Sequence, residues 1–244
     1  MVSMETITIS SRTHPLVKHL VKLRTSKKYR YEKKKVLLEG KKLIAELETP
    51  PTSLIVREGE HPPIDAEQTY IMTKEVFEKI SGTHSPEGIA AEINMPPSQD
   101  LSNKSWVLAL DRMNDPGNMG TLLRSALALG FEGVFLTNSC VDPYNEKALR
   151  AAKGATFKLP LEIGNLETFS KNFHLYIADL EGLSIDDTTF ESPAILLLGN
   201  EAEGVSKEMR KIGTSVTIPL KNQMESLNVA AAGAILMHAM KRQL

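Results

Sequence analysis

The chain has 244 residues, of which 41% are hydrophobic and 24% charged, as in an ordinary soluble protein with one large domain or two small ones. No apolar run approaches the roughly 18 residues of a membrane span, and the N-terminus lacks a basic-then-apolar secretion signal, so we expect a cytoplasmic location. Cys140 is the only cysteine, which excludes an intrachain disulfide and a cysteine metal cluster.

The charge of the chain is unevenly distributed. Residues 12–42 contain twelve Lys or Arg against Glu32 and Glu39, a balance of +10, so the rest must carry −11 to give the total of −1. A solvated helix face is one interpretation, but the length of the run and its scarcity of acids favour contact with RNA or DNA. The predicted contacts are Arg12, Lys18, Lys22, Lys27, Lys28, Arg30, Lys33, Lys34 and Lys35. Tyr29 and Tyr31 lie among them, either to stack on unpaired bases or to cover the domain's own apolar surface.

The first half of the chain is predicted to form a small α/β domain. A helix should begin at Pro15, preceded by candidate N-caps in residues 10–13, because Leu16, Leu20 and Leu23 recur at helical spacing. Further helices are expected at 41–47 and 74–80, and strands at 36–38, 53–56, 69–72 and 87–93.

A linker without periodicity, rich in proline, follows at residues 94–100. We therefore assign residues 1–95 to the first domain, 96–104 to the linker and 105–244 to the second. The second half alternates strands (106–110, 133–136, 175–178, 194–198 and 216–219) with helices (122–129, 145–152, 166–172 and an Ala-rich segment after Asn228). This order predicts a parallel sheet, and polar loops at the strand ends, such as those after 194–198 and 216–219, are where such sheets bind ligands.

Three blocks of residues lie at those predicted strand ends. They are 111–124 (DRMNDPGNMGTLLR), 199–204 (GNEAEG), and 218–229 with Ile218-Pro219 and ESLNV. Each alone is ordinary turn chemistry, but their order and spacing are specific. Together they resemble the signature motifs of the SpoU/TrmH branch of the SPOUT RNA methyltransferases, and 150–155 (RAAKGA) resembles that family's small-residue segment. The N-terminal half is similar to the family's substrate-binding domain, whose fold is shared with RNA-binding ribosomal proteins.

The resemblance implies transfer of a methyl group from S-adenosylmethionine to a ribose 2′-hydroxyl of RNA, without a metal, by a homodimer whose C-terminal domain is tied in a deep trefoil knot. Ribosomal RNA, with the large subunit favoured, is preferred over tRNA because the basic N-terminal domain is separate and resembles ribosomal proteins. A tRNA 2′-O-methyltransferase and a non-catalytic RNA-binding ribosome-assembly factor stay open as alternatives. A nucleotide-binding oxidoreductase is disfavoured because no G-x-G-x-x-G follows a strand.

Site residues follow from the same resemblance. Gly199, Ile218 and Leu227 would line the cofactor pocket, and the catalytic set would be Asn118, Arg124, Glu201, Ser226 and Asn228. A guanidinium is a poor base, so we expect Arg124 to bind a phosphate and stabilise alkoxide charge. A helix starting near Asn118 would place Arg124 about two turns away, so joining the two requires a bent or delayed helix start.

Asn118, Ser226 and Asn228 are expected to orient the ribose, Arg124 or the closing loop, although each also suits helix capping. Glu201 would brace the cofactor loop, pair with Arg124 of a second protomer, or act as a carboxylate at a helix N-terminus. The chain departs from the family at Asn222 and Ala202, where glycine is frequent, and at Ala230, where serine is common. His14, His19 and His84 are expected to pack or contact solvent rather than catalyse.

Overall fold

The computed structural model describes residues 6–66, 68–83, 85–221 and 225–242. The chain divides into two compact units, Met1–Pro96 with Tyr144–Glu146, and Pro97–Pro143 with Lys147–Leu244. Within the described ranges, no helix is long and apolar enough to cross a bilayer.

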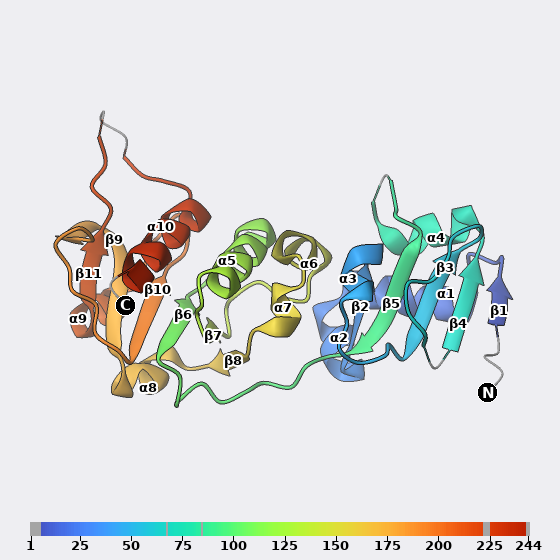
Figure 1. Ribbon diagram of the computed structural model, residues 1–244, viewed down its shortest axis with the longest axis horizontal. Helices are drawn as coiled ribbons and strands as arrows, with labels where there is room; N and C mark the ends of the chain where they lie inside the picture. Colours follow the sequence, from blue (N-terminus) through green and yellow to red (C-terminus); the bar gives the residue numbers. More distant parts are fainter. Residues whose placement is uncertain (1–5, 67, 84, 222–224, 243–244) are drawn as a thin grey trace. The chain divides into compact units, whose positions relative to one another are not determined.

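Unit 1 is built on a five-stranded mixed sheet of order β1-β4-β3-β5-β2 (Figure 1). Strands β1, β4 and β3 are mutually parallel, whereas β5 runs antiparallel to both β3 and β2. Its elements are β1 (Thr6–Ile9), α1 (Pro15–Thr25), α2 (Lys27–Lys33), β2 (Lys35–Glu39), α3 (Lys41–Ala45), β3 (Ser53–Arg57), β4 (Gln68–Met72), α4 (Lys74–Ser81) and β5 (Ile89–Asn94).

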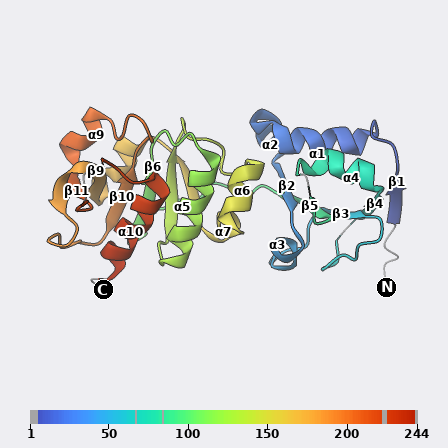
Figure 2. The same cartoon turned by 90° about the horizontal axis from the view of Figure 1, so that it is seen from above.

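The core of unit 1 lies between its sheet and the pair α1 and α4, which cover one face while α3 lies on the other (Figure 2). Helix α1 buries Val17, Leu20 and Leu23, the stripe expected from the sequence. Its N-cap is His14, whose Nδ1 accepts from the Leu16 backbone amide at 3.2 Å, rather than a residue of 10–13. Strand β1 was not predicted, because four residues of Thr-Ile alternation at a chain end are a weak pattern without their partner β4.

Unit 2 contains a six-stranded sheet of order β11-β9-β10-β6-β7-β8. All its paired neighbours are parallel, which confirms the predicted α/β class. Its strands are β6 (Trp106–Leu110), β7 (Gly133–Thr137), β8 (Leu161–Gly164), β9 (His174–Ser184), β10 (Ala194–Leu198) and β11 (Thr214–Thr217). The trefoil knot stays a prediction from the resemblance.

The helices of the C-terminal half are α5 (Pro116–Ala128), α6 (Glu146–Ala152), α7 (Ala155–Lys158), α8 (Leu166–Phe169) with the 3-10 turn η1 (Ser170–Asn172), α9 (Lys207–Ile212) and α10 (Val229–Arg242). Helices α5 and α10 pack side by side in both views (Figures 1 and 2). Helix α5 begins six residues earlier than expected, because Asp115 caps it and Pro116 occupies its first turn. Strand β9 extends beyond the expected 175–178, with a register shift against β11 at Ser215/Val216.

Candidate active site

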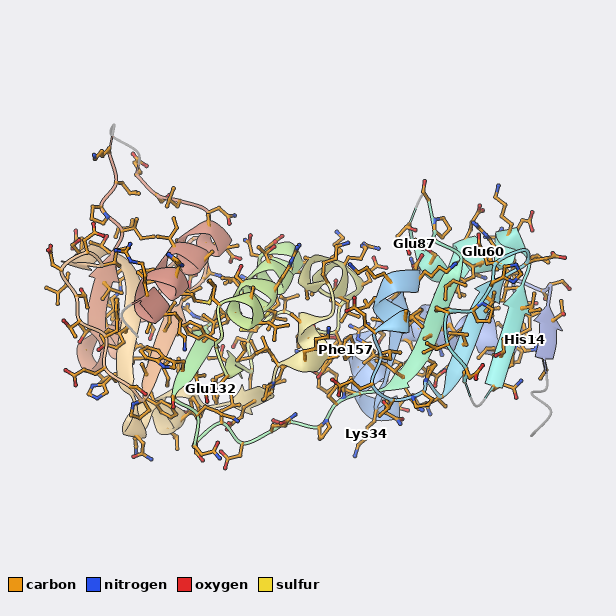
Figure 3. The ribbon with its side chains drawn as sticks, in the orientation of Figure 1. His14, Lys34, Glu60, Glu87, Glu132 and Phe157 are labelled. Atoms are coloured by element: carbon orange, nitrogen blue, oxygen red, sulfur yellow. The ribbon has the colours of Figure 1, made fainter. Side chains whose placement is uncertain are left out.

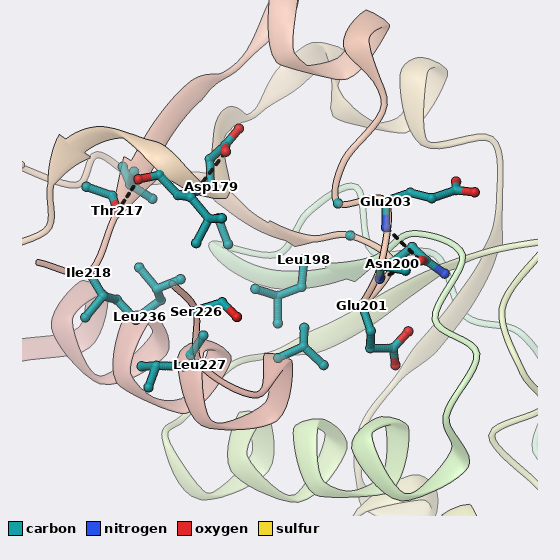
Figure 4. A pocket seen from close by; sticks show the side chains of 18 of the residues that line it. Asp179, Leu198, Asn200, Glu201, Glu203, Thr217, Ile218, Ser226, Leu227 and Leu236 are labelled. Carbon is teal, nitrogen blue, oxygen red and sulfur yellow. Dashed lines mark hydrogen bonds between the residues drawn. The ribbon is translucent and has the colours of Figure 1, made fainter. Parts of the chain in front are cut away.

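A pocket of about 280 Å³ lies at the carboxyl ends of β10 and β11 and against residues 178–180 in the middle of β9. Because the strands are parallel, these ends meet at one edge of the sheet, the position at which open α/β folds bind ligands. The predicted cofactor residues Gly199, Ile218 and Leu227 all line it, as do Glu201 and Ser226. Ile218, Ser226 and Leu227 lie on one side, and Glu201 lies on the other (Figure 4).

The loop that follows β10 is closely folded at Gly199. A Cβ there would lie 2.4 Å from the Gly204 carbonyl carbon, so only glycine fits. The backbones of Asn200 and Gly204 exchange hydrogen bonds of 3.2 and 2.9 Å. The Asn200 Oδ1 atom accepts from the amides of Ala202 and Glu203 at 2.9 and 3.0 Å. The loop on this side of the pocket is therefore held in shape by hydrogen bonds among its own residues.

Three predicted catalytic residues are joined by hydrogen bonds across three segments. Asn228 Nδ2 donates to Asn118 Oδ1 at 3.1 Å, and Asn118 Nδ2 donates to Glu201 Oε1 at 3.2 Å. Asn228 also caps α10, since its Oδ1 accepts from the Ala230 amide at 2.9 Å. Capping and side-chain linkage thus coexist at Asn228, while Glu201 binds the N-terminal region of α5, where Asp115 N also donates to it at 3.4 Å.

Arg124 is not brought to this group. Helix α5 is already regular at Asn118, so the expected delayed start is wrong, and Arg124 lies nearly two turns farther along. Its side chain is exposed and forms no hydrogen bond or ion pair with any residue that the structure describes. Within one chain, Arg124 therefore lies farther along α5 than Asn118 and outside the hydrogen-bonded group.

Ser226 is exposed on the pocket wall, immediately before the α10 cap. The three departures from the family lie in different surroundings. Ala230 is buried in the first turn of α10 and Ala202 is exposed in the pocket loop, whereas Asn222 lies outside the described residues, as does His84. No group of three metal-ligating side chains occurs in the described part of the chain.

Several charged residues at the pocket were given no role from the sequence, among them Asp179, Glu203, Arg210 and Arg112. Asp179 and Arg210 line the pocket and pair with each other, with Arg210 Nη1 3.0 Å from Asp179 Oδ2. Arg112 binds the Gly199–Gly204 loop from outside through Gly204 O at 3.1 Å. Arg112 follows the end of β6, and Asp179 follows the strand predicted at 175–178 although β9 continues past it, so both fit the pattern that identified the other site residues. Arg210 lies on a helix and offered no such indication.

The basic segment of unit 1 is mostly solvent-exposed. Arg12, Lys18, Lys22, Lys27, Lys28, Lys33 and Lys34 are exposed, and Lys34 extends outward beyond α2 (Figure 3). Lys35 is half-buried, with Nζ 2.6 Å from Thr52 Oγ1. The prediction for Arg30 is wrong, because its side chain is buried and donates to the carbonyl oxygens of Leu23 and Arg24 at the end of α1. Arg30 satisfies a helix C-terminus instead of facing a ligand.

Tyr29 is held by its own unit. Its hydroxyl lies 2.9 Å from His19 Nδ1, and His19 Nε2 lies 3.1 Å from Glu92 Oε2. The Tyr29 ring packs against the core of unit 1, with the Lys22 and Lys33 ammonium groups 5.5 and 5.8 Å from its centroid. For Tyr29 this favours the structural interpretation over base stacking, and the His19 contacts agree with its predicted packing role.

Comparison with known proteins assigns both halves of the chain. Residues 105–238 match the SpoU rRNA Methylase family, and residues 14–91 match the MRM3-like substrate binding domain. The chain belongs to the SpoU rRNA methylase family. This SpoU methylase is 33% identical to the 23S rRNA (guanosine(2553)-2'-O)-methyltransferase RlmP of Bacillus subtilis, over 96% of this chain and 98% of that protein. It is 28% identical to the mitochondrial rRNA methyltransferase 3 of Homo sapiens, over 90% of this chain and 70% of that protein.

Solved structures agree with the family. An AdoMet-bound rRNA methyltransferase from Sinorhizobium meliloti superposes with a TM-score of 0.86 at 26% identity, covering 98% of both chains. A putative RNA methyltransferase of the TrmH family from Porphyromonas gingivalis gives 0.81 at 29% identity, covering 93% of this chain and 97% of that one. This SpoU methylase is therefore an RNA methyltransferase with the SPOUT architecture.

Proposed function

We propose that this SpoU methylase transfers a methyl group from S-adenosylmethionine to a ribose 2′-hydroxyl of ribosomal RNA. The observation that carries the proposal is the hydrogen-bonded group Asn228–Asn118–Glu201 beside a strand-end pocket, in a chain of this family. One relative is named as a 2′-O-methyltransferase of 23S rRNA and another as an rRNA methyltransferase. These names favour ribosomal RNA over the tRNA alternative. A cytoplasmic location stays a prediction.

The pocket suits the proposed cofactor in chemistry. Gly199 lets the backbone of the pocket loop fold closely beside the site, Ile218 and Leu227 supply an apolar wall, and Ser226 adds a hydroxyl. When bound, S-adenosylmethionine supplies an electrophilic methyl carbon. The ribose oxygen gains the bond to that carbon, the sulfur loses it as a thioether, and the hydroxyl proton leaves to water or phosphate.

In this proposal the protein orients the ribose rather than supplying a strong base. Asn118 is hydrogen-bonded to Glu201, which lines the pocket, and to Asn228, so its amide group has a fixed orientation. Arg124 would bind the phosphate next to the target ribose, where a guanidinium stabilises developing alkoxide charge.

We also propose that the enzyme is a homodimer in which Arg124 serves the site of a second copy. Its exposure and its distance along α5 from Asn118 support this arrangement. Leu127 on α5 and Ile235 on α10 are large apolar residues with 36% and 41% exposure, which a partner would cover. Light scattering should give a dimer for the native chain and a monomer for Leu127→Glu/Ile235→Glu; a monomeric native chain would contradict the proposal.

The transfer itself is tested by mixing the purified protein with tritiated S-adenosylmethionine and with total RNA from cells that have or lack the gene. We expect one labelled 2′-O-methylated nucleotide in ribosomal RNA from the deletion cells. Label in tRNA would favour the tRNA enzyme. No label, together with no binding of S-adenosylmethionine by calorimetry, would favour the non-catalytic assembly factor.

A further inference from the structure

We propose that Arg112 is a positioning residue that holds the pocket loop Gly199–Gly204 in its ligand-binding shape; this rests on the proposed use of S-adenosylmethionine. Arg112 directly follows Asp111 at the end of β6, the strand hydrogen-bonded beside β10. It therefore belongs to a different segment from the loop and can fix that loop from outside.

The guanidinium of Arg112 contacts the loop at two points. Its Nη2 donates to Gly204 O at 3.1 Å, and its Nη1 donates to the carboxylate of Glu203. In return, Asn200 Nδ2 donates to the Arg112 carbonyl oxygen at 3.0 Å. Because the planar fork of arginine presents parallel donors, these contacts set the orientation of the loop and not only its distance.

Arg112 is itself held in place. Its Nε donates to Asp111 Oδ2 at 3.1 Å, and its backbone amide donates to Thr137 Oγ1 at 3.1 Å. The hydrogen bond with Asp111, followed by the charge of both acids, raises the pKa of Arg112 above its ordinary value. The side chain thus spans from the buried Asp111 to the exposed Glu203 as a permanent cation.

The backbone of Arg112 is left-handed, with φ +53°, a conformation that favours glycine and asparagine. Arginine is disfavoured at this position on backbone grounds, so its side-chain contacts must outweigh that cost. Two substitutions separate the effect of the backbone conformation from that of the side-chain contacts. Arg112→Asn suits the left-handed backbone but removes the guanidinium, whereas Arg112→Lys keeps the charge but remains disfavoured by the backbone.

Substitution of Arg112 tests loop positioning alone, because Arg112 is not one of the residues that line the pocket. Arg210 also binds the end of the loop, with Nε 3.2 Å from Val205 O, but it lines the pocket and could touch a ligand directly. An effect of Arg112 on cofactor binding must therefore pass through the loop.

Cofactor affinity and turnover give the first measurement. Arg112→Asn should raise the Kd and KM for S-adenosylmethionine about ten-fold, the effect of losing one charge-assisted hydrogen bond, and Arg112→Lys should give a smaller increase. The kcat at saturating cofactor and the affinity for RNA should stay near native values. Arg57→Asn is the matched control, since Arg57 also binds a carboxylate (Glu60) and a carbonyl (Pro86), but in unit 1.

Hydrogen exchange without cofactor gives a second measurement that does not depend on the proposed function. The Ala202 and Glu203 amides, bonded to Asn200, should exchange faster in both Arg112 variants than in the native chain. Unchanged exchange and cofactor Kd in Arg112→Lys would overturn the positioning role, even if Arg112→Asn failed to fold. Faster exchange with no cofactor binding by the native chain would instead contradict the proposed function alone.

Discussion

At the scale of single residues, the bond between Asn118 and Glu201 makes a specific prediction for Asn118→Asp. The substitution replaces a donor with a second carboxylate at 3.2 Å from Glu201 Oε1. Like charges at that distance repel, so we expect methyl transfer at pH 8 to fall at least about ten-fold below that of Asn118→Ala. Lowering the pH should partly restore activity in Asn118→Asp alone, because a proton shared by the two carboxylates remakes the hydrogen bond.

The matched control is Asn138→Asp, which adds the same charge at an exposed position just beyond β7. Its rate and its pH profile should follow the native enzyme. If Asn118→Asp and Asn118→Ala showed equal rates and parallel pH profiles, the contact with Glu201 would be irrelevant to transfer.

Burial separates residues that look alike in the sequence. Asn118, Glu201 and Asn228 were identified through a resemblance, and their hydrogen bonds depend on strand order that local patterns do not encode. Arg30 illustrates the opposite case, since composition placed it among exposed lysines. Its position seven residues after Leu23, across a helix break, turns it inward.

Arg30→Met should therefore destabilise unit 1 instead of acting mainly on RNA. Removing the guanidinium leaves the Leu23 and Arg24 carbonyl oxygens without that donor, a loss of about 1–3 kcal/mol in the free energy of unfolding. Denaturant unfolding measures it, with the exposed Lys28→Met as control, expected within about 0.5 kcal/mol of native. If Arg30→Met had native stability but weaker RNA binding, the prediction of Arg30 as an RNA contact would be correct after all.

At the scale of elements, the sequence was most informative where burial is extensive. The α1 stripe was predicted because its one buried face forces helical spacing, and β6 and β10 were predicted because burial of both faces makes every residue apolar. Strands β1 and β8 were not predicted, since each has four residues and no run of adjacent apolar residues, whereas the edge strand β2 contains the apolar run 36–38. The start of α5 was misplaced because its first turn, Pro-Gly-Asn, has poor helix propensity and depends on the Asp115 cap.

Close packing of α5 on α6 predicts the effect of Gly120→Ala. A Cβ at Gly120 would lie 2.2 Å from the Ala148 carbonyl oxygen and 2.8 Å from the Ala152 amide nitrogen. Both are backbone atoms that cannot rotate away, so the free energy of unfolding should fall by about 1–3 kcal/mol despite the better helix propensity of alanine. Thermal unfolding of Ser125→Ala on the same helix is the control. An unchanged melting temperature in Gly120→Ala would mean that the two helices separate at little cost.

At the scale of the whole molecule, the positive charge is concentrated in unit 1. The sequence places +10 in residues 12–42 and −11 elsewhere, and in unit 1 seven of the nine predicted contacts are exposed. Neutralising Lys27, Lys28, Lys33 and Lys34 to Gln removes four exposed cations without touching a core residue. Each phosphate contact contributes about 0.7–0.9 to the slope of log affinity against log salt, so the slope should flatten by up to about three.

The same quadruple variant should keep the native Kd for S-adenosylmethionine, because the pocket lies wholly in unit 2. Titrations of RNA at several salt concentrations, paired with cofactor calorimetry, measure both quantities on one preparation. Four other lysines of unit 1 provide the comparison at equal charge change: Lys41, Lys42 and Lys74, which are exposed, and Lys79, which is half-buried. If both quadruple variants lost the same slope, net charge alone would govern binding; if only the first did, the α2 segment is the RNA contact.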